Sequence, residues 1–483
     1  MQYQVVMKVL GVLLVIFSST LVPPIALSYY FDDGAIGPFI IAFFATLATG
    51  AGLWLVNNRV SRDMRYRDGF MIVVLFWTVL AFFGAIPLYL AYKPSLGFTD
   101  AFFESMSGLT TTGATVLQGI DYLPESIRYY RQQLQWLGGM GIIVLAVAVM
   151  PMLGVGGMQL FRAETPGPMK DTKLTPRITE TAKALWYIYL GLTAICALSY
   201  RLAGMTWFDA IGHSFSTVAI GGFSTHDASL GYFNSAAVDI VAIVFMLIAG
   251  INFALHFIAW RSKSVLGYVR DNEVVVFLVG IFAASVLVLA VLHSFRLFPD
   301  AGELIRQGLL QTVSIATTTG FTTGGYHWWP SFLPVFLLLL SFIGGCAGST
   351  AGGIKIIRVV LLYRQWRREI VRLIHPKAML PLKLGGRPVS DSVGNAVWGF
   401  FSLYMLSFAV LGVVMSATGE DWITAFSAVA ACMNNLGPGL GEVAQNYTAV
   451  SLQGKWVLSF SMLLGRLELY TLLVLFSPAF WRS

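Results

Sequence analysis

The sequence predicts an all-α polytopic integral membrane protein, in which four similar repeats follow two additional N-terminal transmembrane helices. Composition supplies the first observation, since 57% of the 483 residues are hydrophobic and only 11% are charged. An ordinary soluble domain is about 25% charged, and so few charges could not cover the surface of a soluble protein of this size. Soluble enzymes and nucleic-acid-binding proteins are therefore excluded, despite a net charge of +7.

The second observation is a series of helix-length apolar runs. The first run reaches past Pro23 and Pro24 to about Phe31, and the second extends from Ala35 to Val56. No small-residue cleavage pattern follows the first run, so we expect a retained membrane helix rather than a cleaved signal peptide. Eight further runs begin near Gly69, Gln133, Ala182, Ala236, Val274, Leu333, Ala396 and Trp456. Together these runs predict ten spans.

The basic residues predict how these spans are oriented. Residues 57–68 hold four arginines, and the positive-inside rule places such a loop in the cytoplasm. Ten spans then put both termini in the cytoplasm as well. The basic stretch 364–387 falls on the same side. We expect it to lie on the inner leaflet as an interfacial linker, with docking of a partner as the alternative.

The third observation is an internal repeat of short semi-apolar stretches, each placed between two spans and ending in a small-residue turn. The stretches begin at Asp100, Asp209, Gln307 and Thr424, the turns end at Gly113, Gly222, Gly320 and Gly437, and Ser107, Ser216, Ser314 and Ala431 stand six positions before these glycines. A stretch of about twelve residues suits a re-entrant helix. Irregular backbone at membrane depth is tolerated only when it is buried in protein or lines a watery cavity.

We therefore predict four pseudo-symmetric helix–pore-helix–helix repeats around one central pore. Any single turn could be an ordinary loop, but four turns in register favour the repeat. The expected parts are an N-terminal hairpin with its basic loop (1–68), repeat 1 (69–165), repeat 2 (166–270), repeat 3 with a broken inner helix and a basic cytoplasmic linker (271–392), and repeat 4 (393–483).

The four turns are the predicted cation site. They consist of Thr110, Thr111, Thr112 and Gly113; Ala219, Ile220, Gly221 and Gly222; Thr317, Thr318, Thr319 and Gly320; and Asn434, Asn435, Leu436 and Gly437. Their side chains share no chemistry, so the common feature is the backbone, which ends at a residue free to take positive φ. Converging carbonyl oxygens can replace the hydration shell of a monovalent cation, whereas a divalent ion would prefer carboxylates. The preceding helices would point partially negative ends at this site.

A glycine-rich segment interrupts the last span of the third repeat and is the predicted gate. It consists of Gly344, Gly345, Cys346, Ala347, Gly348, Ser349, Thr350, Ala351, Gly352 and Gly353. Each glycine costs a helix about 1 kcal/mol relative to alanine, so we expect an unwound segment that obstructs or clears the pathway. The alternative is close helix packing through small residues, an interpretation that suits Gly138, Gly139 and Gly250.

Arg466 lies within the last span, where an arginine costs about 2.5–3.5 kcal/mol on insertion scales. Such residues normally face a bundle interior or water and mark ion pathways. Glu468 is two residues away and so does not face Arg466 on a helix. We therefore expect Arg466 to contact carbonyls of the broken span or pore water, and to act as an electrostatic barrier. A structural ion pair is the alternative.

These features are similar to those of the Trk/Ktr/HKT superfamily of potassium transporters. The resemblance covers essentially the whole chain and rests on the four turns and three motifs. The motifs are GGCAGSTAGGIKI at 344–356, NNLGPGL at 434–440 and GRLE at 465–468. The two N-terminal spans are similar to the Trk type rather than to the shorter Ktr type.

The resemblance implies potassium uptake across the inner (plasma) membrane by an ion-conducting, channel-like subunit. Glycine at all four filter positions goes with potassium preference in the family, whereas serine at the first is associated with sodium transport in some relatives. The family pattern also implies that residues 345–352 form a gating loop contacted by Arg466. It further implies a homodimer in membrane lipid, with a cytosolic nucleotide-binding regulatory subunit of the TrkA type. The ion would be K⁺, with Rb⁺ accepted and no organic cofactor bound by this chain.

Two other function classes are weighed against the channel. A cation symporter coupling K⁺ to H⁺ or Na⁺ needs titratable residues at mid-membrane, where the sequence offers only Arg466, Glu468 and histidines such as His256. A membrane enzyme would need a nucleophile, an acid–base set or a metal site. The six histidines are scattered and no HExxH, Walker A or GxSxG motif occurs, so no enzymatic activity is expected.

Overall fold

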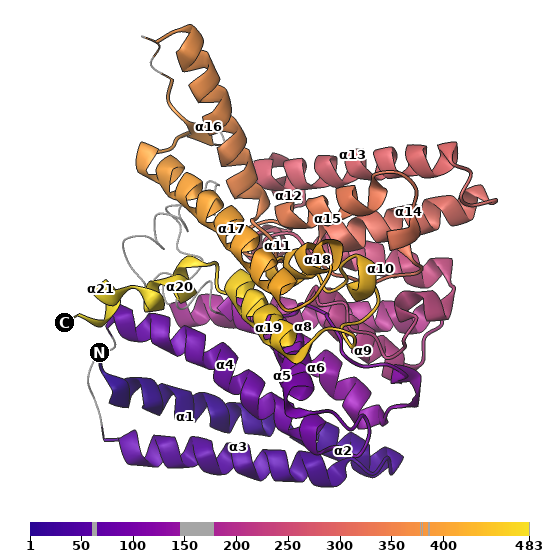
Figure 1. Ribbon diagram of the computed structural model, residues 1–483, viewed down its shortest axis with the longest axis vertical. Coiled ribbons are helices and arrows are strands. Elements are labelled where there is room, and N and C mark those ends of the chain that lie inside the picture. The colour runs from indigo at the N-terminus through magenta and orange to yellow at the C-terminus, as the bar shows by residue number, and fades with distance from the viewer. Residues whose placement is uncertain (60–64, 145–177, 377, 379, 385–386, 483) are drawn as a thin grey trace.

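The computed structural model describes the chain except for residues 60–64, 145–177, 377, 379, 385–386 and 483. Within the described residues the regular structure is almost entirely helical. The two strands found there, β1 (Lys383–Leu384) and β2 (Arg387–Pro388), form one short antiparallel pair. The long helices gather into one bundle, and the two ends of the chain lie close together beside it (Figure 1). The predicted all-α architecture is confirmed.

The N-terminal hairpin consists of α1 (Tyr3–Ser19), α2 (Val22–Phe31) and α3 (Ile36–Asn57). Helices α1 and α3 pack closely through two glycines. A Cβ on Gly11 would lie 2.8 Å from the carbonyl oxygen of Gly50, and a Cβ on Gly50 would lie 2.9 Å from that of Gly11. Small residues let helix backbones approach in this way in membrane proteins.

The same order of elements then occurs four times: a long helix, a short helix, a turn and a further helix. In chain order these helices are α4 (Tyr66–Leu90), α5 (Phe98–Leu109) and α6 (Glu125–Val144); α8 (Ile178–Leu202), α9 (Trp207–Val218) and α10 (Ala236–Ala249); α13 (Asn272–Ser294), α14 (Ala301–Ala316) and α15 (Leu333–Ile343); and α17 (Asp391–Ala417), α18 (Trp422–Met433) and α19 (Leu452–Arg466). A short 3-10 helix also follows each turn: η1 (Ile120–Tyr122), η5 (Ser229–Phe233), η6 (Tyr326–Trp328) and η7 (Gly441–Val443).

The short helices have the length that the sequence predicts. Helices α5, α9 and α18 each contain 12 residues, and α14 contains 16. Three of the four begin at a side-chain N-cap, because Thr206, Asp300 and Asp421 each accept a hydrogen bond from the backbone N–H three residues later. Such caps satisfy amide groups that the first helical turn leaves without partners. All four helices end at the first residue of a turn or directly before it.

The last helix of each of the final three repeats is interrupted. Helices α10 and α11 (Phe253–Ser262) meet at a bend of 93°, and α19 bends by 111° into α20 (Tyr470–Leu473) and η8 (Val474–Phe476). Helix α15 stops at Ile343, and α16 begins only at Ile356. The sequence predicts a break in the third repeat alone. Gly250 serves both a helix break and close helix packing. It lies at the end of α10, and a Cβ there would lie 2.7 Å from the Phe277 ring.

These interruptions explain why fewer uninterrupted spans appear than the ten predicted. Among the described residues, six helices are long and apolar enough to cross a membrane, or eight if each bent pair forms one span. Helix α15 has only 11 residues. Helix α6 begins at Glu125 rather than near Gln133, carries several arginines and glutamines, and ends at the edge of residues 145–177, which lie outside the described part.

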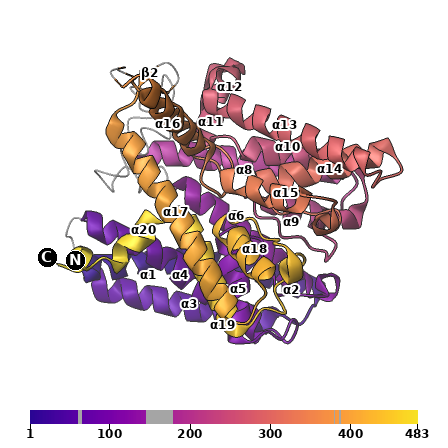
Figure 2. The same ribbon diagram turned by 45° about the horizontal axis from the view of Figure 1, so that its top comes forward.

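The outer surface of the bundle is apolar, as a lipid-facing surface requires. On α13, for example, Val279 and Phe282 are 61% and 69% exposed. Basic residues concentrate instead on the connecting helix α16 (Ile356–Ile374), which carries five arginines. Helices α12 (Leu266–Arg270) and α21 (Pro478–Trp481) are short connecting elements. Helix α16 extends beyond the rest of the bundle (Figure 1), and β2 lies near its far end (Figure 2).

Candidate cation site

The four turns meet in a closed ring. A Cβ on the last glycine of each turn would collide with the carbonyl oxygen of the third residue in a neighbouring turn. The pairs are Gly113 with Gly221, Gly222 with Thr319, Gly320 with Leu436 and Gly437 with Thr112. The contacts therefore connect repeat 1 to 2, 2 to 3, 3 to 4 and 4 back to 1. Only glycine fits at these positions, because any side chain would displace a carbonyl of the adjacent turn.

Each turn contains two residues at positive φ. The final glycines have φ values of 82°, 77°, 86° and 98°, in the order Gly113, Gly222, Gly320, Gly437. The second residues share this conformation, with φ of 51° at Thr111, 54° at Ile220, 65° at Thr318 and 53° at Asn435. The sequence predicts the glycines but not these partners. Positive φ is a genuine outlier for a β-branched residue, and such strain concentrates at functional sites.

The same backbone hydrogen bond anchors every turn to the short helix before it. The N–H of the third turn residue donates to a carbonyl five residues upstream, over 2.9 Å from Thr112 to Ser107, 2.8 Å from Gly221 to Ser216, 2.7 Å from Thr319 to Ser314 and 2.8 Å from Leu436 to Ala431. These acceptors are the positions that the repeat alignment places six residues before each glycine. The helix ends consequently point their partially negative termini at the ring.

Side-chain hydrogen bonds differ from turn to turn. The first and third residues of turn 1 (110–113) pair their hydroxyls over 2.8 Å, and those of turn 3 (317–320) do the same. In turn 4 (434–437), Asn435 donates to the hydroxyl of Thr112 over 3.0 Å, and Tyr447 donates to the carbonyl of Gly437 over 2.6 Å. Turn 2 (219–222) has no polar side chain of its own.

The glycine loop, residues 344–353, lies directly against the helix-end side of the ring. Thr350 donates from its hydroxyl to the carbonyl of Val218 over 2.9 Å, and the Gly352 N–H donates to the Thr318 hydroxyl over 2.7 Å. A Cβ on Gly352 would collide with the carbonyl oxygen of Asn434. The loop therefore contacts three of the four repeats at the point where their turns begin.

A buried carboxylate holds both sides of this loop. Glu273, near the start of α13, is 3% exposed. Its Oε1 accepts hydrogen bonds from the N–H of Ala347 over 2.7 Å and from the N–H of Ile357 over 3.2 Å. Residues 347–357 are thus held at both ends, on either side of the contact with the ring. Glu273 is not among the site residues predicted from the sequence, although an acidic residue at the start of an apolar run was a signal for it.

Arg466, the last residue of α19, reaches the same loop. It is 4% exposed, and its Nη1 and Nη2 donate to the carbonyls of Thr350 and Gly138, each over 3.3 Å. Among the described residues no carboxylate lies within ion-pair distance of it. Glu468 pairs with Arg358 over 2.7 Å instead. The carbonyl contacts that the sequence predicts are therefore present, and in the described residues the ion-pair alternative does not apply.

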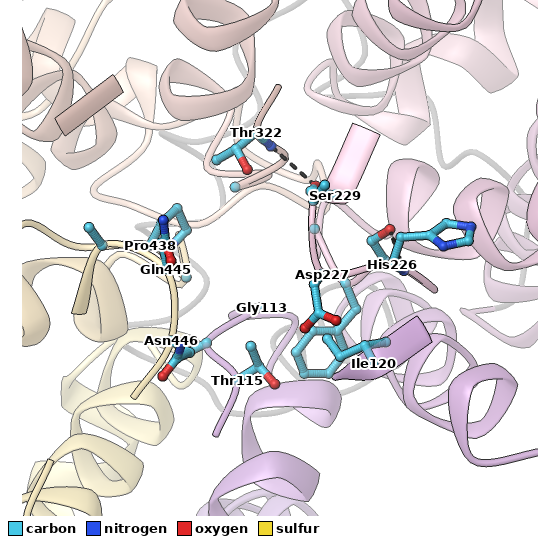
Figure 3. Close-up of a pocket in the computed structure, with 18 of the residues that line it drawn as sticks. Gly113, Thr115, Ile120, His226, Asp227, Ser229, Thr322, Pro438, Gln445 and Asn446 are labelled. Carbon is cyan, nitrogen blue, oxygen red and sulfur yellow. Dashed lines mark hydrogen bonds between the residues drawn. The ribbon is translucent and has the colours of Figure 1, made fainter. Parts of the chain in front are cut away.

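On the opposite side of the ring, the segments that follow the turns line a cavity of about 430 Å³. Figure 3 shows this cavity, with the Asp227 carboxylate directed into it and the His226 ring turned away. The four turn glycines all line this cavity. Since it opens onto the ring from the side away from the glycine loop, it is a suitable entrance for an ion.

An aspartate–histidine cluster stands beside this cavity. The Nδ1 of His226 bonds to Asp121, its Nε2 lies 3.3 Å from an Asp209 oxygen, and its ring stacks on Tyr232. Burial acts to lower the pKa of His226, but the contacts with Asp209 and Asp121 outweigh it and raise that pKa above its ordinary value. For Asp121, hydrogen bonds from His226 and the Asp227 N–H outweigh burial and lower the pKa.

Comparison with known proteins places this architecture in a family. The family model for TrkH, described as a cation transport protein, matches residues 36–483. The chain belongs to the TrkH family. It is 56% identical over 488 residues to the Trk system potassium uptake protein TrkH of Vibrio parahaemolyticus, and 54% identical over 485 residues to that of Halomonas elongata, with all of each chain covered. A crystal structure of the potassium transporter TrkH from Vibrio parahaemolyticus matches with a TM-score of 0.93 at 52% identity, over all of both chains.

Membership of the TrkH family confirms the resemblance predicted from the motifs and identifies the chain as an integral membrane transport protein. The structure adds polar residues that the motifs did not include. Beside Glu273, these are Glu104 and Arg131, which form a buried ion pair of 2.7 Å next to turn 1, and Gln135 of α6. A dense run of polar residues at the start of a predicted span, residues 131–135, was the available signal.

Proposed function

We propose that this chain takes up potassium across the inner membrane, as the ion-conducting, channel-like subunit of a Trk-type system. Its full-length similarity to proteins named as potassium uptake proteins supports the ion. The ring of turns supports the mechanism, because rings of backbone carbonyls can replace the hydration shell of K⁺. None of the turn residues carries a charged side chain, so the backbone carbonyls are the groups that would select the ion. Rb⁺, which is similar to K⁺ in size, is expected to be accepted.

The glycine loop and Arg466 form the proposed gate. The loop contacts the ring from the inner side, and Arg466 and Glu273 hold it there through backbone groups. A buried arginine beside the path also repels cations. Opening then requires the loop to leave the ring, and its glycines give it the conformational freedom to do so.

The chain's surroundings are proposed on the same basis. The protein lies in the inner membrane, and both termini and the basic helix α16 face the cytoplasm. The chain forms a homodimer in lipid, and a nucleotide-binding regulatory subunit of the TrkA type docks on the cytosolic face. The division of the chain into an N-terminal hairpin and four repeats, with the bounds given above, is part of this proposal. No organic cofactor is assigned to this chain.

A test of the ion site uses the ring glycines. Gly113→Ser places a side chain against the carbonyl of Gly221, so we expect a lower potassium-over-sodium permeability ratio in proteoliposomes. Gly204→Ser is the matched control, since Gly204 also has positive φ, of 108°, but has no atom within 4 Å of an added Cβ. An unchanged ratio in Gly113→Ser would remove Gly113 from the filter.

A coupled symporter remains the second candidate, and single-channel recording separates the two. The turns and the glycine loop contain no carboxylate or histidine to bind a coupled proton, which favours the channel. In a planar bilayer we expect discrete conductance steps far above the turnover of a carrier. Flux that requires a proton or sodium gradient and shows no such steps would support the symporter.

A further inference from the structure

Turn 2 is the exception in the ring, because it lacks the side chains that brace the others. Turns 1 and 3 have paired hydroxyls and turn 4 has asparagines, whereas turn 2 reads Ala-Ile-Gly-Gly. It also holds Ile220, a β-branched residue, at φ 54°. A strained backbone persists only when the surrounding structure determines it. Turn 2 therefore needs external support.

Gln135 of α6 supplies that support from the preceding repeat. Its Nε2 donates to the carbonyl of Gly221 over 2.6 Å, and its Oε1 accepts from the N–H of Phe223 over 3.0 Å. One side-chain amide thus bonds to the backbone on both sides of Gly222. Gln135 is fully buried, so neither group has water as a substitute, and a buried polar group without a partner is costly.

Two neighbouring side chains continue this brace. Gln132 donates to the carbonyl of Phe223 over 3.2 Å, and Arg131 donates to the carbonyl of Ser224 over 3.1 Å. Arg131 is itself fixed by Glu104 of α5 over 2.7 Å and by stacking 4.3 Å above the Phe223 ring. Three residues of α6 therefore bond to backbone groups at positions 221, 223 and 224.

We propose that Gln135 is a positioning residue for ion selectivity, which fixes the carbonyl of Gly221 within the ring. This inference rests on the proposed function of the turns. The Gly221 carbonyl faces Gly113 across the boundary between repeats, so its direction affects the ring at that point. Arg131 and Gln132 hold the segment that follows. Selectivity in repeat 2 thus depends on α6 of repeat 1, rather than on a side chain of the turn.

The test compares Gln135→Ala with Gln133→Ala. Gln133 lies on the same helix, is 5% exposed and donates over 2.6 Å to the carbonyl of Thr20, away from the turns. Each variant loses a buried glutamine and its hydrogen bond to a backbone carbonyl, so both are expected to lower the unfolding temperature. Only Gln135→Ala is expected to lower the potassium-over-sodium permeability ratio, by about fivefold, which corresponds to one net hydrogen bond.

The isosteric variants Gln135→Met and Gln135→Glu serve if Gln135→Ala does not fold. Gln135→Met lacks both hydrogen bonds, whereas Gln135→Glu keeps an acceptor for Phe223 and loses the donor to Gly221. A folded variant of Gln135 with the wild-type ratio would overturn the inference, as would an equal loss of selectivity in Gln133→Ala. If the wild-type protein itself shows no potassium selectivity, the proposed function fails instead.

Discussion

At the scale of the residue, the second position of each turn has a backbone conformation that the sequence does not predict and that the fold imposes. Glycine at the fourth position predicts positive φ, because without a Cβ it adopts that conformation at no steric cost. Thr111, Ile220 and Thr318 give no such signal, yet all three have positive φ. The pore-helix end and the adjacent turns force this conformation, and neither is visible in a local sequence window.

A single residue, His226, is also expected to make the stability of the protein depend on pH. Its pKa in the folded protein is raised, so protonated His226 stabilises the fold fully below its ordinary pKa of about 6.5, and this stabilisation disappears as pH rises through the raised value. We expect the unfolding temperature in detergent to fall as the pH rises above about 6.5, and His226→Gln to remove that part of the fall. An equally steep fall in His226→Gln would contradict the assignment.

At the scale of the element, the interrupted helices have different origins. Glycines alone predict the break at 344–353, since they weaken a helix wherever they are placed. The bend after Arg466 has no comparable run of glycines, since a single glycine, Gly465, stands beside it. Residues 467–469 contain no glycine, and Glu468 and Leu469 take positive φ while Glu468 pairs with Arg358 of α16. This bend results from packing against an element distant in the chain, so local patterns could not predict it.

The glycine loop is the element whose proposed role as a gate can be tested through basal ion uptake. Arg466→Ala removes the hydrogen bond from Arg466 to the Thr350 carbonyl of the loop. We expect basal Rb⁺ uptake by proteoliposomes to rise by roughly tenfold, since one hydrogen bond to a charged group contributes about 1.5 kcal/mol. Deletion of residues 345–352 is expected to raise it further. Arg306→Ala is the control, because the partners of Arg306 are Asp239, over 3.5 Å, and Asn234, over 2.8 Å, and neither belongs to the loop. Wild-type uptake in both loop variants would show that the gate lies elsewhere.

At the scale of the whole molecule, the predicted orientation can be tested on intact cells. The three native cysteines are buried. Labelling by a thiol reagent will therefore come mainly from a cysteine that is introduced at the surface. We expect a membrane-impermeant maleimide to label Asp227→Cys, beside the outer cavity, in intact cells. It should label Arg367→Cys, on the exposed side of α16, only after the membrane is opened. The reverse pattern would mean that the protein is inserted the other way.

The sequence by itself determined the membrane class, the four repeats, the position of every turn glycine and the loop at 344–353. These follow from composition, periodicity and the intrinsic conformational freedom of glycine, which are local properties. Only the tertiary structure decided that the turns close into a ring in the order of the repeats, that Arg466 bonds to one carbonyl of the loop and one of α6, and that Gln135 braces a turn of another repeat. Those contacts join residues about 90 to 330 positions apart, and only the packed backbone brings such residues within hydrogen-bond distance.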